Sequence, residues 1–167
     1  MLDFVPVPSD QWEVLQDIMN SQPDFLWLLK GKKALNQIDI LKYLQKSKRM
    51  NRNLAFIKKD NQCIGMIDYQ WKSPLDGHPW VGLFLIHNSY ERQGYGTLAF
   101  AKFEGMVREK GDSMIRLGVH EGNDVGHLFW TKQGFVPFKR FTLDECQMIG
   151  LEKRIYFYVK MGDSNVR

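Results

Sequence analysis

Gly94 and Gly96 lie two residues apart, directly after a long apolar run, and could form a binding site for an anion. Glycine lacks a Cβ, so its backbone N–H can approach a ligand in conformations that other residues avoid. A helix that begins at about Gly96 adds unpaired first-turn N–H groups and the positive end of its dipole. These groups would suit a phosphate or a pyrophosphate, bound largely through the main chain. An ordinary strand-to-helix turn is the alternative interpretation of the two glycines.

The elements around this loop follow from the pattern of apolar residues. The run that begins at Trp80 predicts a buried strand, and residues 97–110 predict a helix that Gly111 ends. The apolar residues available for packing on this helix are Leu98, Ala101, Phe103, Met106 and Val107. The glycine loop is therefore expected at the N-terminus of a helix, where an anion site requires it to be.

The rest of the chain alternates between apolar segments and turn-forming residues. Helices are predicted from an N-cap at Ser9 to about Asn20, over 35–48 and over 125–133. The second of these would pack through Leu35, Ile38, Leu41 and Leu44. Further strands are predicted at 3–7, 53–58, 63–71, 114–119, 135–138 and 152–161.

The connections complete this prediction. Residues 21–33 and 72–79 are expected to be loops, and Asp60 and Asn61 should form a hairpin turn. No second-domain linker or internal repeat interrupts the order of elements. The sequence therefore predicts one α/β domain around a mixed sheet, over residues 1–167.

The composition is typical of a folded protein. A chain of 167 residues with 44% hydrophobic and 13% aromatic residues can bury a sizeable core without metals or disulfides. The N-terminus lacks a basic segment followed by a long apolar one, and the apolar runs are too short to span a bilayer. We therefore expect a soluble, cytoplasmic protein that binds no membrane. Cys63, Cys146 and the four histidines show no metal-ligand spacing, so no metal is expected.

The positive charge is concentrated in one region. The chain has a net charge of +4, but the segment from Lys30 to Asp60 holds ten Lys or Arg residues against two Asp residues, a balance of +8. This basic region could attract nucleic acid, an acidic protein or a polyanionic cofactor, although a solvated helical face is the commoner meaning of such a run. Nucleic acid is the least favoured partner, because no aromatic-rich RNA-binding signature accompanies the charge.

The segment from Trp80 to Phe138 resembles the GNAT superfamily of acyl-CoA-dependent N-acyltransferases, both in motif and in the order of its elements. The family carries a Gln/Arg-x-x-Gly-x-Gly/Ala loop, and residues 91–96 read ERQGYG. It also carries an Asn after the next strand and then Tyr-x-x-x-Gly-Phe, where this chain has Asn123 and, over 130–135, WTKQGF. The resemblance implies a GNAT-like fold with a twisted, mostly antiparallel sheet of about six or seven strands flanked by about four helices.

The resemblance further implies acetyl-CoA as the acyl donor. The loop that would hold its pyrophosphate through N–H groups consists of Arg92, Gln93, Gly94, Tyr95, Gly96 and Thr97. Backbone groups at Phe84 and Ile86 would bind the pantetheine arm and the thioester carbonyl, because in the family this strand splays from the strand after the helix. Asn123 would help to fix the cofactor's amide groups. An N–H directed at the carbonyl would also stabilise the oxyanion that forms as an amine attacks, by about 3 kcal/mol per donor.

Two residues depart from the family's pattern. Glu91 stands where the family has Gln or Arg, so this side chain cannot donate to a phosphate, and Arg92 is left to supply the charge. Trp130 stands where many members have a Tyr that protonates the departing thiolate. An indole N–H can donate a hydrogen bond but is no proton source near neutral pH. Packing against the cofactor is the alternative role for Trp130.

The sequence does not single out a general base. The strand before the loop contains no carboxylate, and the candidates are His87 and Asp68, followed by His120 and Glu121. A histidine has a pKa suited to this role, and a carboxylate could act directly or through water. Each of the four can also be explained as a turn, surface or satisfied core residue.

These observations favour an N-acetyltransferase that moves an acetyl or other short acyl group to a primary amine by direct attack in a ternary complex. The acceptor would be a small molecule, a peptide or a protein, and a homodimer is compatible with the sequence. A noncatalytic acyl-CoA sensor is the alternative, motivated by Trp130, Glu91 and the missing strand carboxylate. An RNA-binding protein that uses the basic region is a third and less favoured interpretation.

Overall fold

The structure, a computed structural model, describes residues 1–157 of the chain. Its strands are β1 (Leu2–Pro6), β2 (Asn53–Lys59), β3 (Gln62–Gln70), β4 (Trp80–Ile86), β5 (Met114–His120), β6 (Val136–Leu143) and β7 (Cys146–Arg154). Its helices are α1 (Trp12–Asn20), α2 (Pro23–Lys30), α3 (Gln37–Arg49), α4 (Tyr95–Glu109) and α5 (Asp124–Lys132), with a 3₁₀ turn, η1, at Asn88–Tyr90. The predicted α/β fold with a mixed sheet is confirmed, with five α-helices in the described residues where four were expected.

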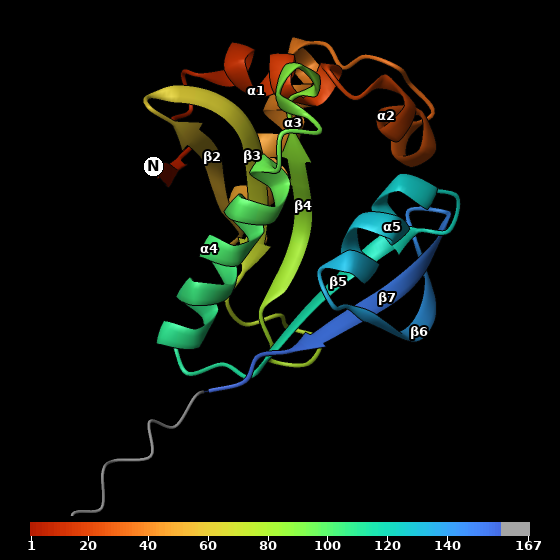
Figure 1. Ribbon diagram of the computed structural model, residues 1–167. Coiled ribbons are helices and arrows are strands. Elements are labelled where there is room, and N and C mark those ends of the chain that lie inside the picture. The colour runs from red at the N-terminus through yellow and green to blue at the C-terminus, as the bar shows by residue number, and fades with distance from the viewer. Residues whose placement is uncertain (158–167) are drawn as a thin grey trace, which may run out of the picture.

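Two neighbouring strands of the sheet, β4 and β5, pair over only part of their length. The strand order of the sheet is β1-β2-β3-β4-β5-β7-β6, and every neighbouring pair is antiparallel except β4 and β5. These two are parallel and pair only at Trp80 with Arg116 and at Val81 with Leu117. Beyond Val81 the strands diverge, as Figure 1 shows. The second half of β4 therefore has backbone groups that β5 does not pair with.

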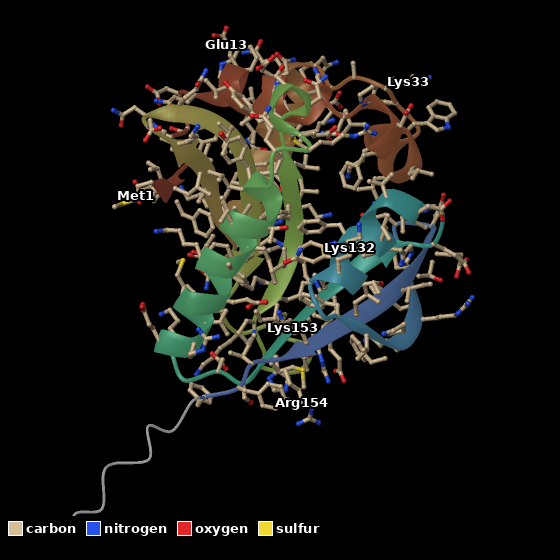
Figure 2. All side chains as sticks on the ribbon, in the orientation of Figure 1. Met1, Glu13, Lys33, Lys132, Lys153 and Arg154 are labelled. Atoms are coloured by element: carbon tan, nitrogen blue, oxygen red, sulfur yellow. The ribbon has the colours of Figure 1, made fainter. Side chains whose placement is uncertain are left out.

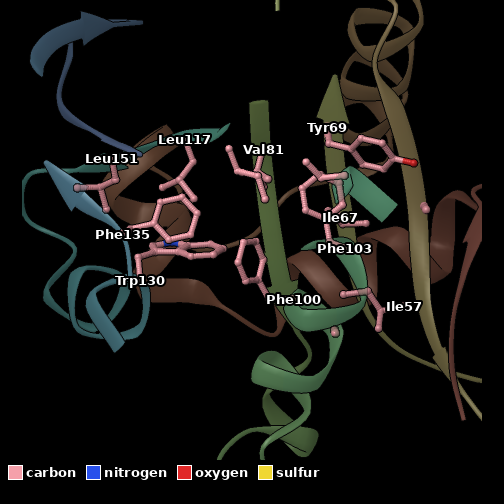
Figure 3. Packing of buried hydrophobic residues seen from close by; sticks show 14 of the residues in the cluster. Ile57, Ile67, Tyr69, Val81, Phe100, Phe103, Leu117, Trp130, Phe135 and Leu151 are labelled. Carbon is pink, nitrogen blue, oxygen red and sulfur yellow. The ribbon is translucent and has the colours of Figure 1, made fainter. Parts of the chain in front are cut away.

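Helices cover both faces of the sheet and create two cores. α4 and α5 cover one face, over buried residues that include Ile67, Phe100, Phe103, Leu117 and Trp130 (Figure 3). α1, α2 and α3 cover β2, β3 and β4 on the other face, over Leu15, Leu26, Ile40, Phe56 and Met66. Burial of each large apolar side chain stabilises the fold by about 1.5 to 3 kcal/mol. An ion pair also ties the sheet to a helix, because Lys153 of β7 (Figure 2) donates to Glu104 of α4.

The largest difference from the predicted elements is α2, since residues 21–33 were expected to form a loop. Pro23 occupies the first turn of this helix, where its fixed φ fits and its missing N–H is not needed. Gly31 ends the helix in the left-handed conformation, at φ +65°. The same proline and glycine that suggested a loop therefore mark the two ends of a short helix.

The predicted helix caps and faces need correction. Ser9 does not cap α1, whose N-cap is Gln11, and α3 begins after Asn36, whose side chain forms a capping box with Asp39. The predicted packing residues of this segment are partly wrong. Leu35 is buried and Leu44 packs against the core, but Ile38 and Leu41 are 61% and 38% exposed, and Ile40 is buried instead. A spacing of three residues drifts around a helix of 3.6 residues per turn. For the same reason Leu98 and Ala101 of α4 are exposed, and Ala99 and Phe100 are buried in their place.

The hairpins were predicted with mixed success. Asp60 and Asn61 both have positive φ and join β2 to β3 as a two-residue turn, which confirms that prediction. Asp144 and Glu145 form a similar turn without any glycine, so the hairpin of β6 and β7 was missed. β7 spans Cys146–Arg154, so it shares only residues 152–154 with the strand predicted at 152–161, and residues 158–161 of that prediction lie outside the described part of the chain.

Candidate functional site

The glycine loop leads from β4 into the N-terminus of α4, as predicted. Gly94 is the N-cap of α4 at φ +81°, and Arg92 also has a positive φ, of +57°. The first N–H after residue 91 that donates a backbone hydrogen bond is that of Leu98, whose acceptor is the carbonyl of Gly94. Within residues 1–157, the N–H groups of residues 92–97 have no acceptor. A row of free N–H groups at the positive end of a 15-residue helix has the geometry and the charge that suit an anion.

Positive and polar side chains surround this loop. Arg92 is exposed and has no ion-pair partner in the part of the chain that the structure describes. The Lys59 ammonium group donates to the Tyr95 hydroxyl at 2.6 Å, and this hydrogen bond raises the pKa of Lys59. Thr97 accepts a hydrogen bond from Gln133 of α5 at 3.1 Å, which ties the start of α4 to the end of α5.

The end of β4 presents backbone groups that β5 does not pair with toward the region where β5 diverges. The N–H of His87 donates to the carbonyl of Ile64 in β3 at 2.8 Å. Backbone groups alternate in direction along a strand, so the peptide groups of Phe84 and Ile86 face away from β3. Phe84 and Ile86 are the two positions of this strand that were predicted to bind the cofactor.

A β-bulge marks the point at which β4 leaves β5. Tyr69 pairs with Val81 and Asp68 pairs with Leu83, so Gly82 is an extra residue in β4. Gly82 is exposed, and a Cβ built on it would lie 3.2 Å from Arg52 and 3.6 Å from the Asp68 carboxyl carbon. Glycine at this position lets the backbone of β4 approach Arg52 and Asp68 closely, a role that was not predicted from the sequence.

Asp68, one of the two predicted base candidates, is fully buried on the α3 side of the sheet. Its Oδ2 accepts hydrogen bonds from the Tyr43 hydroxyl at 2.5 Å, from Ser47 at 3.3 Å and from Arg52 at 3.3 Å. Burial, together with the adjacent carboxylate, raises the pKa of Tyr43 well above its usual value, so the phenol stays a donor. The other oxygen, Oδ1, is buried without any hydrogen-bond partner in residues 1–157.

His87, the other candidate, has both ring nitrogens engaged. Nδ1 accepts from the N–H of Ser89 at 3.2 Å, and Nε2 lies 3.3 Å from the carboxylate of Asp17 in α1. Because a backbone N–H can only donate, Nδ1 must be the acceptor and Nε2 must carry the proton. A neutral His87 in this arrangement has no free lone pair for a substrate proton.

The two remaining candidates, His120 and Glu121, are similarly occupied. His120 Nδ1 accepts from the N–H of Gly122 at 2.9 Å. Glu121 accepts from Arg140 at 2.7 Å, and its side chain is nearly half exposed. Of the four candidates, only Asp68 has a buried acceptor atom that nothing else in the described part of the chain uses.

Trp130 and Asn123 have structural partners of their own. Trp130 is 8% exposed and packs edge-on against Phe100, Phe129 and Phe135, at ring-centroid distances of 4.8 to 5.2 Å (Figure 3). Asn123 caps α5, and its side-chain oxygen accepts from the N–H of Gly126 at 2.9 Å. Only its amide N–H₂ group is left for a ligand.

Three contacts join α1 and the start of α2 to the glycine loop, and none of them was predicted. The first is the pair of Asp17 and His87 described above. In the second, the N–H of Asn88 donates to the Ser21 hydroxyl at 3.2 Å. In the third, the Gln22 amide donates to the carbonyl of Ile86 at 2.8 Å and to the carboxylate of Glu91 at 2.5 Å. Glu91 is therefore turned toward Gln22.

A pocket away from the glycine loop is lined by none of the predicted site residues. A pocket of about 590 Å³ lies between α3 and the edge formed by β1 and β2, and Arg52, Lys48 and Leu54 are among its lining residues. Within residues 1–157 no group of three or more His, Cys, Asp or Glu side chains could hold a metal ion. No helix in the same part of the chain is long and apolar enough to cross a membrane.

Known proteins resemble this chain in sequence and in fold. The family model described as "Acetyltransferase (GNAT) family" matches residues 12–135. No curated protein matches the chain. An acetyltransferase from Thermus thermophilus has a similar structure, with a TM-score of 0.77 and 19% identity over 92% of this chain and 97% of that one.

Two further solved structures share the fold. One is the PaiA N-acetyltransferase from Thermoplasma acidophilum in complex with coenzyme A, with a TM-score of 0.62 and 18% identity over 92% of this chain and 99% of that one. The other is a ribosomal-protein-alanine N-acetyltransferase from Brucella melitensis, with a TM-score of 0.64 and 14% identity over 91% of this chain and 99% of that one.

Proposed function

The chain belongs to the GNAT acetyltransferase family, and on this premise we propose that it transfers an acetyl or other short acyl group from acetyl-CoA to a primary amine. The amine would attack directly in a ternary complex. The observation that carries the proposal is the set of free N–H groups at residues 92–97, next to a strand that its parallel neighbour leaves after Val81. This arrangement suits a ligand with a pyrophosphate at one end and an amide-rich arm along the strand.

The residues present fit acetyl-CoA. The loop N–H groups and the Arg92 guanidinium would hold the pyrophosphate, and a left-handed Gly94 keeps the cradle clear, with nothing within 4 Å of its ideal Cβ position. The backbone groups of Phe84 and Ile86 would bind the pantetheine arm, and the Asn123 amide would donate to one of its carbonyls. The Gln22 amide donates to the Ile86 carbonyl, so the pantetheine arm would have to replace this hydrogen bond to reach that carbonyl.

Acetyl-CoA supplies a thioester whose carbonyl carbon an amine can attack. As the C–N bond forms, negative charge develops on the carbonyl oxygen, and a backbone N–H of β4 directed at this oxygen would stabilise it by about 3 kcal/mol. The N–H of Phe84 is the first one beyond the bulge that faces away from β3. It is therefore our candidate for this donor.

Asp68 is our candidate for the general base, in preference to His87. The attacking amine must first lose the proton of its ammonium form, and Asp68 Oδ1 is an acceptor atom with no other partner in residues 1–157. The proton would pass Gly82, directly or through a water, beside the Arg52 guanidinium, which lies 3.2 Å from the ideal Cβ position of Gly82. Tyr43 and Arg52 would stabilise the carboxylate between turnovers.

The departing thiolate does not require a side-chain acid. A thiol with a pKa of about 8.5 leaves as the thiolate at a cost of about 2 kcal/mol at pH 7. Trp130 is then a core residue that shapes the region between β4 and α5, and its indole N–H has no partner within residues 1–157. The thiolate can take its proton from water after it leaves.

The release of CoA thiol from acetyl-CoA, measured with a panel of amines, tests this proposal. The panel should contain polyamines, amino acids and peptides with a free amino terminus, because one protein of the same fold is named as a ribosomal-protein-alanine N-acetyltransferase. Amine-dependent thiol release supports transfer. Tight acetyl-CoA binding without turnover on any amine would favour the acyl-CoA sensor, which the departures at Glu91 and Trp130 make the second candidate.

A further inference from the structure

The basic region of the sequence is not one continuous surface in the structure. Four of its residues, Lys30, Lys32, Lys42 and Lys46, line a single pocket of about 240 Å³ between α2 and α3. We refer to it as the lysine pocket. Lys48 and Arg52 belong to the other side of α3, where they line the pocket near β1 and β2.

The charge in the lysine pocket is only partly neutralised. Lys32 pairs with Asp39 at 2.9 Å, and Lys46 lies 3.8 Å from Asp144 in the turn between β6 and β7. Lys30 and Lys42 are exposed and have no acidic partner within residues 1–157. Asp39 is the one acid that lines the pocket, and the hydrogen bond from Lys32 and the charges of Lys32 and Lys42 lower its pKa. The pocket therefore presents two free ammonium groups to a ligand.

The floor of the lysine pocket is apolar. Met19, Leu35 and Tyr43 contribute to it, and the Tyr43 hydroxyl already donates to Asp68. An acidic side chain has both parts that such a site accommodates, an aliphatic stem and a carboxylate. Single-stranded nucleic acid would call for a basic groove with aromatic rings on which bases stack, and this pocket offers one ring whose hydroxyl is engaged.

The pocket lies close to the candidate base. Tyr43 lines the pocket and bonds Asp68, and Asp68 flanks Gly82 at the point where β4 leaves β5. One tyrosine side chain therefore separates the lysines from the proposed site of proton transfer. The contact of Lys46 with Asp144 also places the turn between β6 and β7 beside the pocket, on the sheet face that α3 covers.

From this geometry we propose that the lysine pocket binds the acidic side chains of a peptide acceptor, next to the amine that is acetylated. The inference rests on the proposed transferase function and names the class of its acceptor. Acidic residues near the reactive amine would lower KM through Lys30 and Lys42, whereas the chemical step at Asp68 would be unchanged.

Two peptides of equal length test the inference. Both carry the same free amino terminus, and one has Glu where the other has Gln at the positions that follow. Transfer kinetics and the binding of the fluorescently labelled peptides should be measured for the wild type and for the double variant Lys30→Gln/Lys42→Gln. The matched control, Lys48→Gln/Arg49→Gln, removes the same charge from the same region but not from the lysine pocket.

The wild type should prefer the Glu peptide about 5- to 20-fold in KM at low salt, with little change in kcat. The double variant should lose this preference, the control should keep it, and added salt should weaken it. Equal KM for the two peptides, or a preference that only the control variant loses, would overturn the inference and leave the transferase assignment intact.

Three other results are distinguishable. Lysine-dependent binding of the Glu peptide without transfer from acetyl-CoA to any amine would contradict the transferase function, and with it the acceptor role of the peptide. An oligonucleotide that binds more tightly than the Glu peptide and displaces it would overturn the inference, because the ligand of the lysine pocket would then be a nucleic acid. Failure of the wild type to bind the Glu peptide at low salt would also overturn the inference.

Discussion

The Gln22 amide donates a 2.5 Å hydrogen bond to the carboxylate of Glu91 and, from the same nitrogen, a 2.8 Å hydrogen bond to the carbonyl of Ile86. Glu91 is the residue of the glycine loop that departs from the family's Gln or Arg, and its partner lies at the start of α2. The presence of Glu at position 91 therefore has a local explanation, since its carboxylate holds the Gln22 side chain against the end of β4. It also leaves a negative charge one residue from the proposed phosphate site.

This relationship predicts that Glu91→Gln tightens CoA binding. The variant keeps a side chain that can bond Gln22 but removes the charge that repels the pyrophosphate. Affinity measured by calorimetry should rise about 3- to 5-fold at low salt and return to the wild-type value at about 1 M salt. Glu109→Gln, at the other end of α4, removes the same charge as a control. Equal effects of the two variants would contradict the proposed position of the pyrophosphate.

Gly94→Val should weaken acetyl-CoA binding by at least about tenfold. Gly94 has a φ of +81°, which costs a residue with a Cβ about 1 to 2 kcal/mol, and the valine methyl groups would enter the phosphate cradle. Circular dichroism should show an unchanged fold. Gly105→Ala, in the interior of α4, is the control and should stabilise the protein by about 0.5 to 1 kcal/mol with unchanged affinity. A folded Gly94→Val protein with wild-type affinity would exclude the loop as the pyrophosphate site.

Asp68→Asn should lower kcat by about 10²- to 10³-fold and leave the affinity for acetyl-CoA unchanged. An amide of the same shape can keep a hydrogen bond with Tyr43 but cannot take a proton from the amine. His87→Asn should lower kcat by no more than about threefold, because both nitrogens of His87 are already engaged. If the His87 variant loses more activity than the Asp68 variant, the assignment of the base is wrong. Chemical denaturation should accompany both assays, to separate misfolding from lost chemistry.

Trp130→Phe should act on stability more than on rate. The smaller ring leaves a cavity among Phe100, Phe129 and Phe135, at a cost of about 1 to 3 kcal/mol in unfolding free energy. The transfer rate per folded molecule should stay within about threefold of the wild type. A large loss of rate at unchanged stability would mean that the indole N–H takes part in the reaction.

The stability that Asp39 contributes should depend on pH. Its hydrogen bonds from Lys32 and from the N–H of Asn36 lower its pKa from 3.8 in the folded state. A lowered folded-state pKa stabilises the protein above the unfolded-state pKa, and this stabilisation is lost as pH falls through the folded-state value. Asp39→Asn should thus destabilise the protein at pH 7, and the difference should shrink as the pH falls below 3.8. Thermal melts of both proteins across this range check the prediction, and a pH-independent difference would refute it.

The order of buried strand, glycine loop and helix was predicted well from the sequence, because local rules decide it. An apolar run, two glycines and a helix start are contiguous in the chain, and the structure assembles them as β4, the loop and α4. The hairpin at Asp60 and Asn61 was predicted for the same reason, since both residues tolerate positive φ.

The contacts around Glu91 and around Asp68 were not predictable in this way, because they join distant parts of the chain. Gln22 reaches Glu91 across 69 positions, and Tyr43 reaches Asp68 across 25. No spacing rule connects such pairs. The bulge at Gly82 also escaped notice, because a glycine within an apolar run does not reveal which strand residue lies opposite it. Asp68 and His87 were predicted together as base candidates, and only their partners in the structure distinguish them.

The most direct test of the proposed cofactor site is a titration of ¹⁵N-labelled protein with CoA, followed amide by amide in NMR spectra. It requires neither an acyl group nor a known acceptor. The amides of residues 92–97, together with Phe84 and Ile86, should show the largest shift changes, and Gly94→Val should abolish them. Binding of CoA that leaves these amides unmoved, or the absence of any binding at millimolar CoA, would contradict the proposal.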